Sequence, residues 1–182
     1  MILMFRKFVR FAAAAAVLLP SVRLCAARPQ HQSEPLNPVE IDQLRDAAQD
    51  PEQRIKLFLQ FARARLAALE QMRADPKVKD RGQQTHDMLQ TFLDVYDELN
   101  DNIDTFVDRR ADLRRPLKTV IEADTEFQAR LRALKTSAAT SKAEVEQYRF
   151  VLENVVDTVD GNTQDHRQLM VEQEEAAKHK KK

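Results

Sequence analysis

The sequence predicts an all-α protein, an elongated antiparallel helical bundle in which three to four long helices pack in a coiled-coil-like manner. Its 182 residues include only two glycines, whereas alanine, leucine and the charged residues that favour helix are abundant. Turn residues are therefore too scarce to close many β-strands. Apolar residues also recur at alternating spacings of three and four residues, which is the heptad pattern of packed helices.

The first segment of the chain has the organisation of a cleavable secretory signal peptide. In residues 1–27, basic residues up to Arg10 precede an apolar run, Pro20 ends that run, and two alanines close the segment. A basic region, an apolar region and a small-residue cleavage site in this order are typical of export signals. The apolar run is about half as long as a membrane-spanning helix. We therefore predict a periplasmic or extracellular protein with no stable membrane span after cleavage.

Three alternatives for this segment stay open: an uncleaved membrane anchor, a lipoprotein signal and a mitochondrial transit peptide. A lipoprotein would use Cys25, but Arg23 and Leu24 stand before it, where small residues are wanted. A transit peptide is likewise rich in arginine and poor in acids, and Glu34 is the first acidic residue of the chain. The compact apolar run and the closing alanines favour secretion.

Cleavage after Ala27 would change the chemistry that the chain can offer. The full chain has a formal net charge of zero, and residues 1–27 hold its only cysteine, four basic residues and no acid. Because four positive charges leave with this segment, the remainder would carry a net charge of about −4. Such a protein has no thiol for catalysis or metal binding, and we expect no nucleic-acid partner.

The residues after the signal segment predict a linker followed by one helical domain. Residues 28–38 contain three prolines among polar residues, which is typical of a flexible linker. Residues 39–182 are then expected to form the helical bundle domain. Its first element is a short amphipathic helix at residues 39–48, which places Leu44 and two other apolar residues on one side.

Capping residues mark the start of two further helices. In Asp50-Pro51-Glu52-Gln53, the aspartate can cap the helix, the proline suits the first helical position and the glutamine suits the third. This helix should end near Ala74, because the residue before a proline avoids helical angles. Ser141-Lys142-Ala143-Glu144 is a second capping box. The helix that it begins should run at least to Val159, and its apolar pattern continues toward the C-terminus.

The region between these helices carries the longest heptad seam. Because the seam passes Pro116 without a skip, we favour one long helix over residues 83–135 that is kinked at this proline. The alternative is two helices joined at residues 111–116. The seam is formed by Leu89, Phe92, Tyr96, Leu99, Ile103, Phe106, Arg110, Leu113, Leu117, Val120, Asp124, Phe127, Leu131 and Leu134.

Three polar residues, Arg110, Asp124 and His166, fall on the apolar seams and are candidate site residues. Buried polar groups at such positions set the register or the partner of a helix, at a cost in stability. The alternative, which we favour for Arg110 and Asp124, is that the helices part there and both side chains reach water. If His166 is instead buried and neutral, its protonation below about pH 6 would loosen that end of the domain.

A row of aspartates lies opposite the long seam. Asp87, Asp94, Asp101 and Asp108 recur every seven residues. A carboxylate row at this heptad position is normally a solvated outer face, which is the interpretation that we favour. The alternative is an acidic contact strip for a basic partner, whose affinity would fall as salt is added.

The sequence contains no motif for catalysis, for a cofactor or for a metal. It lacks the Glu-x-x-His pairs of di-iron bundles, the Cys-x-x-Cys-His of haem attachment, phosphate-binding glycine loops and the usual nucleophile motifs. We therefore expect neither an enzyme nor a cofactor. The prediction is an exported, non-catalytic helical protein that acts as an interaction, structural or chaperone-like module for another envelope or secreted protein, or for a second copy of itself.

Surplus apolar residues supply the candidate contact surface for such a module, namely Phe58, Phe61, Phe150 and Val151. The alternative function is a small-ligand-binding or metal-binding helical bundle. Its pocket would lie near the polar seam residues Arg110, Asp124 or His166.

Overall fold

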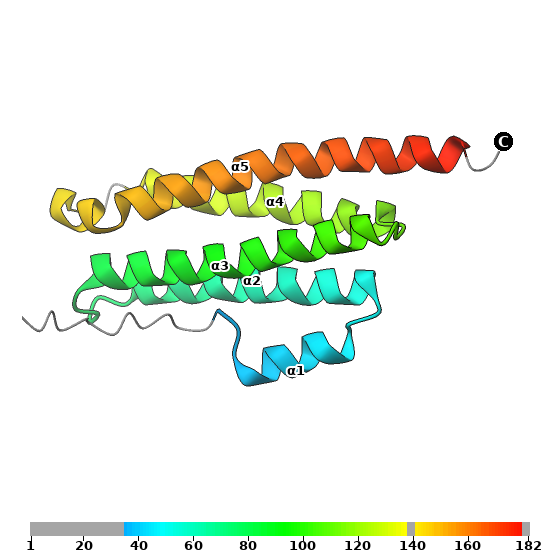
Figure 1. The fold of residues 1–182 in the computed structure, drawn as a ribbon. Helices are drawn as coiled ribbons and strands as arrows, with labels where there is room; N and C mark the ends of the chain where they lie inside the picture. The colour runs from blue at the N-terminus through cyan, green and yellow to red at the C-terminus, as the bar shows by residue number, and fades with distance from the viewer. Residues whose placement is uncertain (1–34, 138–140, 180–182) are drawn as a thin grey trace, which may run out of the picture. The chain divides into compact units, whose positions relative to one another are not determined.

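The structure is a computed structural model that describes residues 35–137 and 141–179 (Figure 1). Within these ranges it contains five helices and no strand, so the all-α prediction is confirmed. The predicted signal segment and most of the predicted linker lie outside the described residues. No helix in the described ranges combines the length and the apolarity that a membrane span needs. The helices are α1 (Pro38–Asp46), α2 (Pro51–Ala74), α3 (Arg81–Asp108), α4 (Arg114–Lys135) and α5 (Lys142–His179).

The four longer helices enclose one apolar core. Helix α2 packs on α3 and α4, and α5 packs on the same two helices, so that α2 and α5 lie on opposite sides of the core. The chain reverses direction at each connection from α2 to α5 (Figure 1). Three aromatic rings meet at the centre: Phe92 of α3 lies 5.3 Å from Phe127 of α4 and 5.9 Å from Tyr96, measured between ring centroids. Edge-on and stacked rings at these separations attract one another beyond the area that they bury.

Two helix starts, those of α2 and α5, lie where the capping residues predict them. The carboxylate of Asp50 accepts a hydrogen bond from the Gln53 amide at 3.1 Å, which confirms the predicted start of α2. Ser141 likewise accepts from the Glu144 amide at 3.2 Å, at the start of α5. Such caps satisfy backbone donors that the first helical turn leaves free. Helix α5 continues through Gly161 to His179, beyond its predicted minimum.

The favoured single helix over residues 83–135 is wrong, because α3 ends at Asp108 and α4 begins at Arg114. Arg110 takes a left-handed backbone conformation with φ of 58°. Its amide donates to the Val107 carbonyl at 2.8 Å, and the Ala111 amide donates to the Phe106 carbonyl at 3.0 Å. These two bonds form a Schellman motif, which ends a helix and satisfies its last carbonyls. The proline that was expected to cause a kink lies in the first turn of α4, where a missing N–H costs nothing.

A partly buried ion pair helps to fasten helix α1 to α2, beside the apolar contact of Leu44. Glu40 and Asn37 form a capping box, so the last residues of the predicted linker belong to the start of this helix. The Glu40 carboxylate also accepts two hydrogen bonds from the Arg65 guanidinium, at 2.9 and 2.6 Å. Burial raises the pKa of Glu40, but the bonds from Arg65 and from the Asn37 amide outweigh burial and lower that pKa below its usual value.

The conformation of Arg110 leads to a stability prediction. A residue with a Cβ costs roughly 1–2 kcal/mol in the left-handed region, whereas glycine adopts it freely but also gains freedom in the unfolded chain. Arg110→Gly should therefore raise the free energy of unfolding by about 0.5–1 kcal/mol, measured by urea denaturation. Arg110→Ala removes the same side chain but keeps the Cβ, so it should give no comparable gain. Equal stability of the two variants would contradict this account of the turn.

The ion pair of α1 leads to a pH prediction. The folded-state pKa of Glu40 is lowered, so the ionised carboxylate stabilises the fold at any pH above the unfolded-state pKa. This stabilisation is lost as the pH falls through the folded-state pKa. At pH 7, Glu40→Gln should lower the hydrogen-exchange protection of α1 amides roughly tenfold, the size of a charge-assisted hydrogen bond. Wild type and variant should converge as the pH falls through the lowered folded-state pKa of Glu40. Asp42→Asn, which removes an exposed pair with Arg45, is the control and should change little.

Candidate functional site

Three polar side chains from three helices meet inside the apolar core. Tyr96 of α3 donates its hydroxyl to Oδ1 of Asp124 in α4 at 2.8 Å. Nδ1 of His166 in α5 lies 2.8 Å from the other carboxylate oxygen. Tyr96 and Asp124 are 0% exposed and His166 is 4% exposed. Each helix contributes one group, so these contacts fix the relative position of α3, α4 and α5.

The structure brings together two of the three predicted polar seam residues. Asp124 and His166 are bonded to each other, whereas Arg110 is exposed in the turn between α3 and α4. The expectation that Asp124 reaches water is wrong, because Tyr96 and His166 supply the hydrogen bonds that water would otherwise provide. Sequence reasoning missed the role of Tyr96. A tyrosine on a seam counts as an apolar core residue, so no local signal separates it from Phe92.

The proton on Tyr96 is held firmly. Burial raises the pKa of Tyr96 well above its usual value, and the charge of Asp124 and the hydrogen bond to it raise that pKa further. The phenol therefore remains a donor across the physiological pH range. The contact between Asp124 and His166 needs one proton between Oδ2 and Nδ1, and the imidazole is the donor when the carboxylate is ionised.

His166 also reaches a shallow surface pocket of about 230 Å³ between α3 and α5. A carboxylate that orients an imidazole toward a pocket is the arrangement that supports the base in hydrolases. The buried hydroxyl of Thr163, three residues before His166 on α5, donates instead to the Val159 carbonyl at 2.6 Å and accepts from Gln128 at 3.1 Å. No described hydroxyl therefore forms a nucleophile–base pair with His166. In the described ranges no group of three or more histidine, cysteine, aspartate or glutamate side chains could hold a metal ion.

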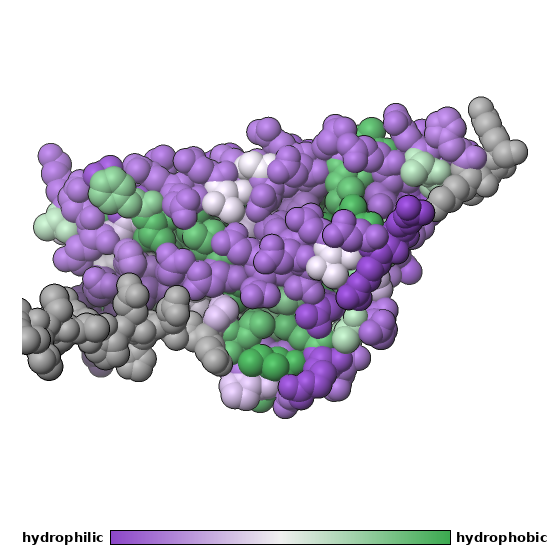
Figure 2. Space-filling model, viewed as in Figure 1, coloured by the Kyte–Doolittle hydropathy of each residue, from purple (hydrophilic) through white to green (hydrophobic). Residues whose placement is uncertain are grey.

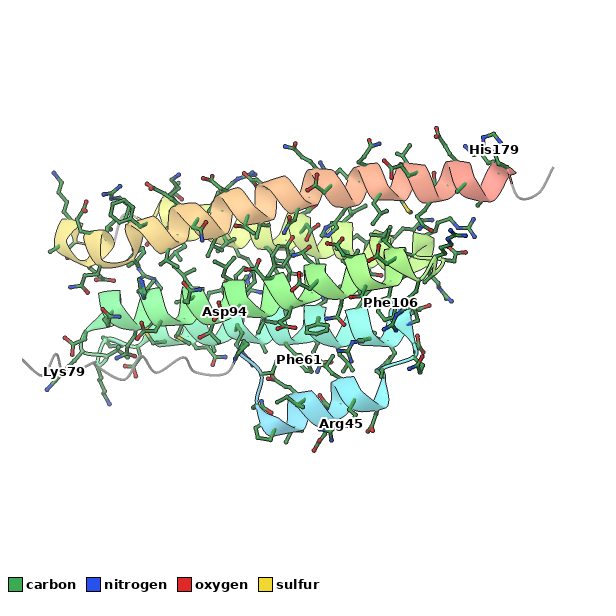
Figure 3. All side chains as sticks on the ribbon, viewed as in Figure 1. Arg45, Phe61, Lys79, Asp94, Phe106 and His179 are labelled. Atoms are coloured by element: carbon green, nitrogen blue, oxygen red, sulfur yellow. The ribbon has the colours of Figure 1, made fainter. Side chains whose placement is uncertain are left out.

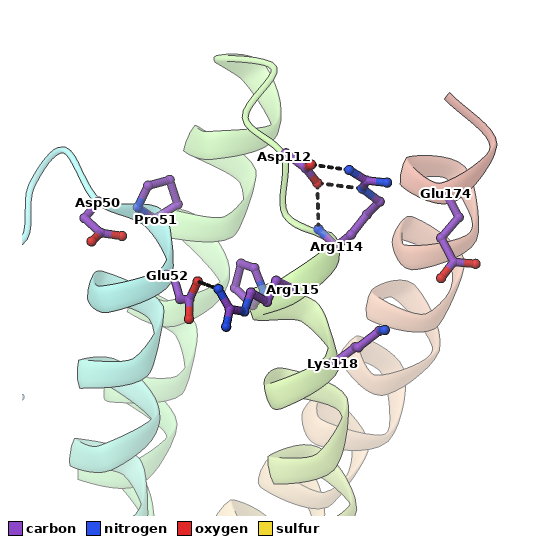
Figure 4. Close-up of a pocket in the computed structure, with 9 residues that line it drawn as sticks. Asp50, Pro51, Glu52, Asp112, Arg114, Arg115, Lys118 and Glu174 are labelled. Carbon is purple, nitrogen blue, oxygen red and sulfur yellow. Dashed lines mark hydrogen bonds and ion pairs between the residues drawn. The ribbon is translucent and has the colours of Figure 1, made fainter. Parts of the chain in front are cut away.

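A second pocket, of about 490 Å³, lies where the starts of α2 and α4 meet the last turns of α5 (Figure 4). Asp112 accepts hydrogen bonds from Arg114, and Arg115 lies 3.5 Å from a carboxylate oxygen of Glu52. Four acids and three bases line this pocket in all, so its walls select neither an anion nor a cation. Its lining is Asp50, Pro51, Glu52, Asp112, Arg114, Arg115, Pro116, Lys118 and Glu174.

The four aspartates of the candidate acidic strip all lie on α3, where Figure 3 labels Asp94. Asp94 is half-buried and accepts a hydrogen bond from Gln90 at 2.8 Å, while Asp87, Asp101 and Asp108 are exposed. Burial and the neighbouring carboxylates raise the pKa of Asp97, which lies between Asp94 and Asp101. No described cation forms an ion pair with Asp94, Asp101 or Asp108. A solvated acidic face accounts for these observations.

A groove of about 410 Å³ between α2 and α4 was not foreseen from the sequence. Its floor is apolar, with Leu66, Leu69 and Leu131, and arginines line its sides. The guanidinium of Arg130 is held by Glu70 and Glu126. The Nε of Arg81 is buried and has no hydrogen-bond partner among the described residues. The groove therefore combines apolar surface with one guanidinium group whose hydrogen bonding is incomplete.

Comparison with known proteins provides no family for this chain: no protein-family model, no curated protein and no solved structure matches it.

The network around Asp124 predicts a graded loss of stability. Asp124→Ala leaves a phenol and an imidazole without their acceptor in the core, so it should lower the free energy of unfolding by about 3–5 kcal/mol. Asp124→Asn keeps the shape and can still bond to a neutral imidazole, so we expect a smaller loss of about 1–3 kcal/mol. Asp101→Ala on the exposed face of α3 is the control, with an effect of about 0.5 kcal/mol or less. Urea denaturation measures these differences. If Asp124→Ala and Asp101→Ala lowered the free energy of unfolding equally, the buried network would not stabilise the fold as argued.

Proposed function

We propose that this chain is an exported, non-catalytic helical protein that serves as an interaction, structural or chaperone-like module for another envelope or secreted protein. In this proposal residues 1–27 direct export and are removed, and residues 28–38 form a linker. Residues 39–182 then form an antiparallel four-helix bundle with coiled-coil-like packing. The packing of both α2 and α5 on α3 and α4, around one apolar core, supports that architecture.

The observation that carries the proposal is an aromatic side chain left at the surface of α5. Of the surplus apolar residues in the sequence, Phe58, Phe61 and Val151 are buried, whereas Phe150 is 70% exposed. The guanidinium of Arg149 lies over this ring, 4.2 Å from its centroid. Aromatic and arginine side chains are enriched in protein interfaces. Figure 2 shows hydrophobic patches at separate places along α5, and a further patch over α1, among largely hydrophilic side chains.

The polar groups that could suggest catalysis have another role in this proposal. Tyr96, Asp124 and His166 hold three helices in register, and their hydrogen bonds are directed at one another. A rigid arrangement of helices keeps the exposed face of α5 in one conformation, which lowers the entropy lost when a partner binds. The network therefore supports a module that presents a preformed surface.

A small-ligand-binding role is the alternative, and the groove beside Arg81 favours it. An apolar floor with arginines along its sides suits a ligand with an apolar body and an anionic head. Native mass spectrometry of the chain purified from its own source should then detect a bound small molecule that Arg81→Gln releases. A ligand-free spectrum would eliminate this alternative.

The test of the main proposal is capture of a partner from the native envelope fraction. Phe150→Glu places a charge at the exposed ring and should abolish capture without lowering stability, because the side chain is outside the core. Val39→Glu is the matched control, since it makes the same kind of change at another exposed apolar residue, on α1. Capture that survives Phe150→Glu, or a partner lost equally with both variants, would contradict recognition through α5. Intact mass of the same preparation should lack residues 1–27, and retention of Met1 would contradict export by cleavage.

A further inference from the structure

The outward face of α5 carries a second heptad pattern that the core does not use. Seven exposed residues follow one another at alternating spacings of four and three, and we name them the α5 outer stripe. Only one of the seven is charged, in a chain whose residues are 32% charged. A solvated helix face is normally rich in charge, whereas the centre of a protein interface is depleted of it. The α5 outer stripe is Phe150, Asn154, Asp157, Gly161, Gln164, Gln168 and Val171.

Gly161, at the middle of the stripe, is not required by packing within the chain. Glycine is a poor helix former, yet α5 continues through it. A Cβ at Gly161 would meet no atom within 4 Å, whereas a Cβ at Gly82 would lie 2.9 Å from the Glu144 carbonyl oxygen. One of the two glycines is therefore explained by the fold, and the other faces open space. A glycine on an exposed helix face allows another backbone to approach closely.

We propose that a second copy of this chain packs on the α5 outer stripe, with the two α5 helices antiparallel and crossing at Gly161. This inference rests on the proposed interaction function and names the partner. The stripe has three residues on each side of Gly161, so a two-fold axis at the glycine superimposes it on itself. Phe150, which is 70% exposed, then faces the partner's Val171, which is 49% exposed. Each copy supplies both members of the pair, so the apolar contact forms twice.

The stripe positions on either side of Gly161 are compatible with the antiparallel direction. Asp160, which this register places beside the partner's Asp160, is paired with Arg132 of its own chain at 3.0 Å. Asn154 faces the partner's Gln168, and the two side-chain amides can form a hydrogen bond. Asp157 faces the partner's Gln164, whose amide can donate to the carboxylate. At the rim, Glu153 lies beside the partner's Arg167, a cation that forms no ion pair within the described residues. A parallel pair would instead place Asp157 against the same residue of the partner. Repulsion between these like charges disfavours that direction.

Cysteine cross-linking tests the direction and the register together. In a full chain with Cys25→Ser, the variant Phe150→Cys/Val171→Cys carries two thiols 21 residues apart on one helix, or roughly 31 Å. Because a disulfide needs Cα atoms within about 7 Å, the two cannot join inside one chain. The antiparallel pair predicts a covalent dimer under mild oxidation. Neither single variant should cross-link alone, although the two mixed together should. Efficient cross-linking of Phe150→Cys alone would overturn the antiparallel arrangement.

Gly161 provides a second test that does not depend on thiols. A seam of this length is smaller than a standard interface, so we expect micromolar self-association, followed by sedimentation equilibrium between about 1 and 100 µM. Gly161→Ala should raise the melting temperature of the chain, since alanine favours helix and has free space. The same change should weaken self-association at least tenfold, because it separates the two backbones. Unchanged association, or a chain that stays monomeric throughout, would overturn the proposal.

The two proposals can fail separately. A monomeric chain that still captures another envelope protein through Phe150 would overturn self-association and leave the interaction function in place. A dimer that dissociates on Gly161→Ala, in a chain that captures no other protein, would support self-association while removing the role for a second protein.

Discussion

The structure depends on how the buried carboxylate of Asp124 is satisfied. An ionisable group without exposure is costly unless partners replace the water that it has lost. Those partners, Tyr96 and His166, lie on two other helices. Their hydrogen bonds offset the desolvation of Asp124 only when α3, α4 and α5 lie in one register. Apolar seams alone would tolerate a shift by one heptad, because leucine, valine and phenylalanine recur along them. The polar network distinguishes the native register from these near-equivalent shifts.

Helix α2 has no member in this network and is placed differently. Its apolar side chains pack on α3 and α4, while its arginines reach across the rim of the core. Arg63 bonds to Glu126 of α4 at 2.8 Å, and Arg73 bonds to Glu144 of α5 at 3.1 Å. These contacts are partly exposed and individually weak. Apolar burial therefore places α2, whereas α3, α4 and α5 combine apolar burial with the polar network at Asp124.

The sequence predicted faces and helix starts better than it predicted connections. Side-chain periodicity and capping residues are local signals, so the seams and the start of α2 at Asp50 could be deduced directly. The turn between α3 and α4 could not be deduced in this way. An apolar face can keep the same heptad register whether the chain continues as one helix or reverses into a second one. A glycine would have marked the reversal, but Arg110 occupies the left-handed position. Asp124 and His166 were singled out as polar seam residues, yet their contact spans 42 residues and no local pattern encodes it.

The outer faces of α3 and α5 differ in a way that bears on association. Both follow a heptad spacing, but the face of α3 repeats aspartate, whereas the α5 outer stripe is nearly uncharged. Two acidic faces brought together would repel one another, and the repulsion would grow as water is removed from between them. The acidic face of α3 therefore opposes self-association at that helix and leaves α5 as the less costly surface to desolvate. Helical proteins discriminate between alternative assemblies in this way: repulsion at one face disfavours contact there, and association takes place at another face.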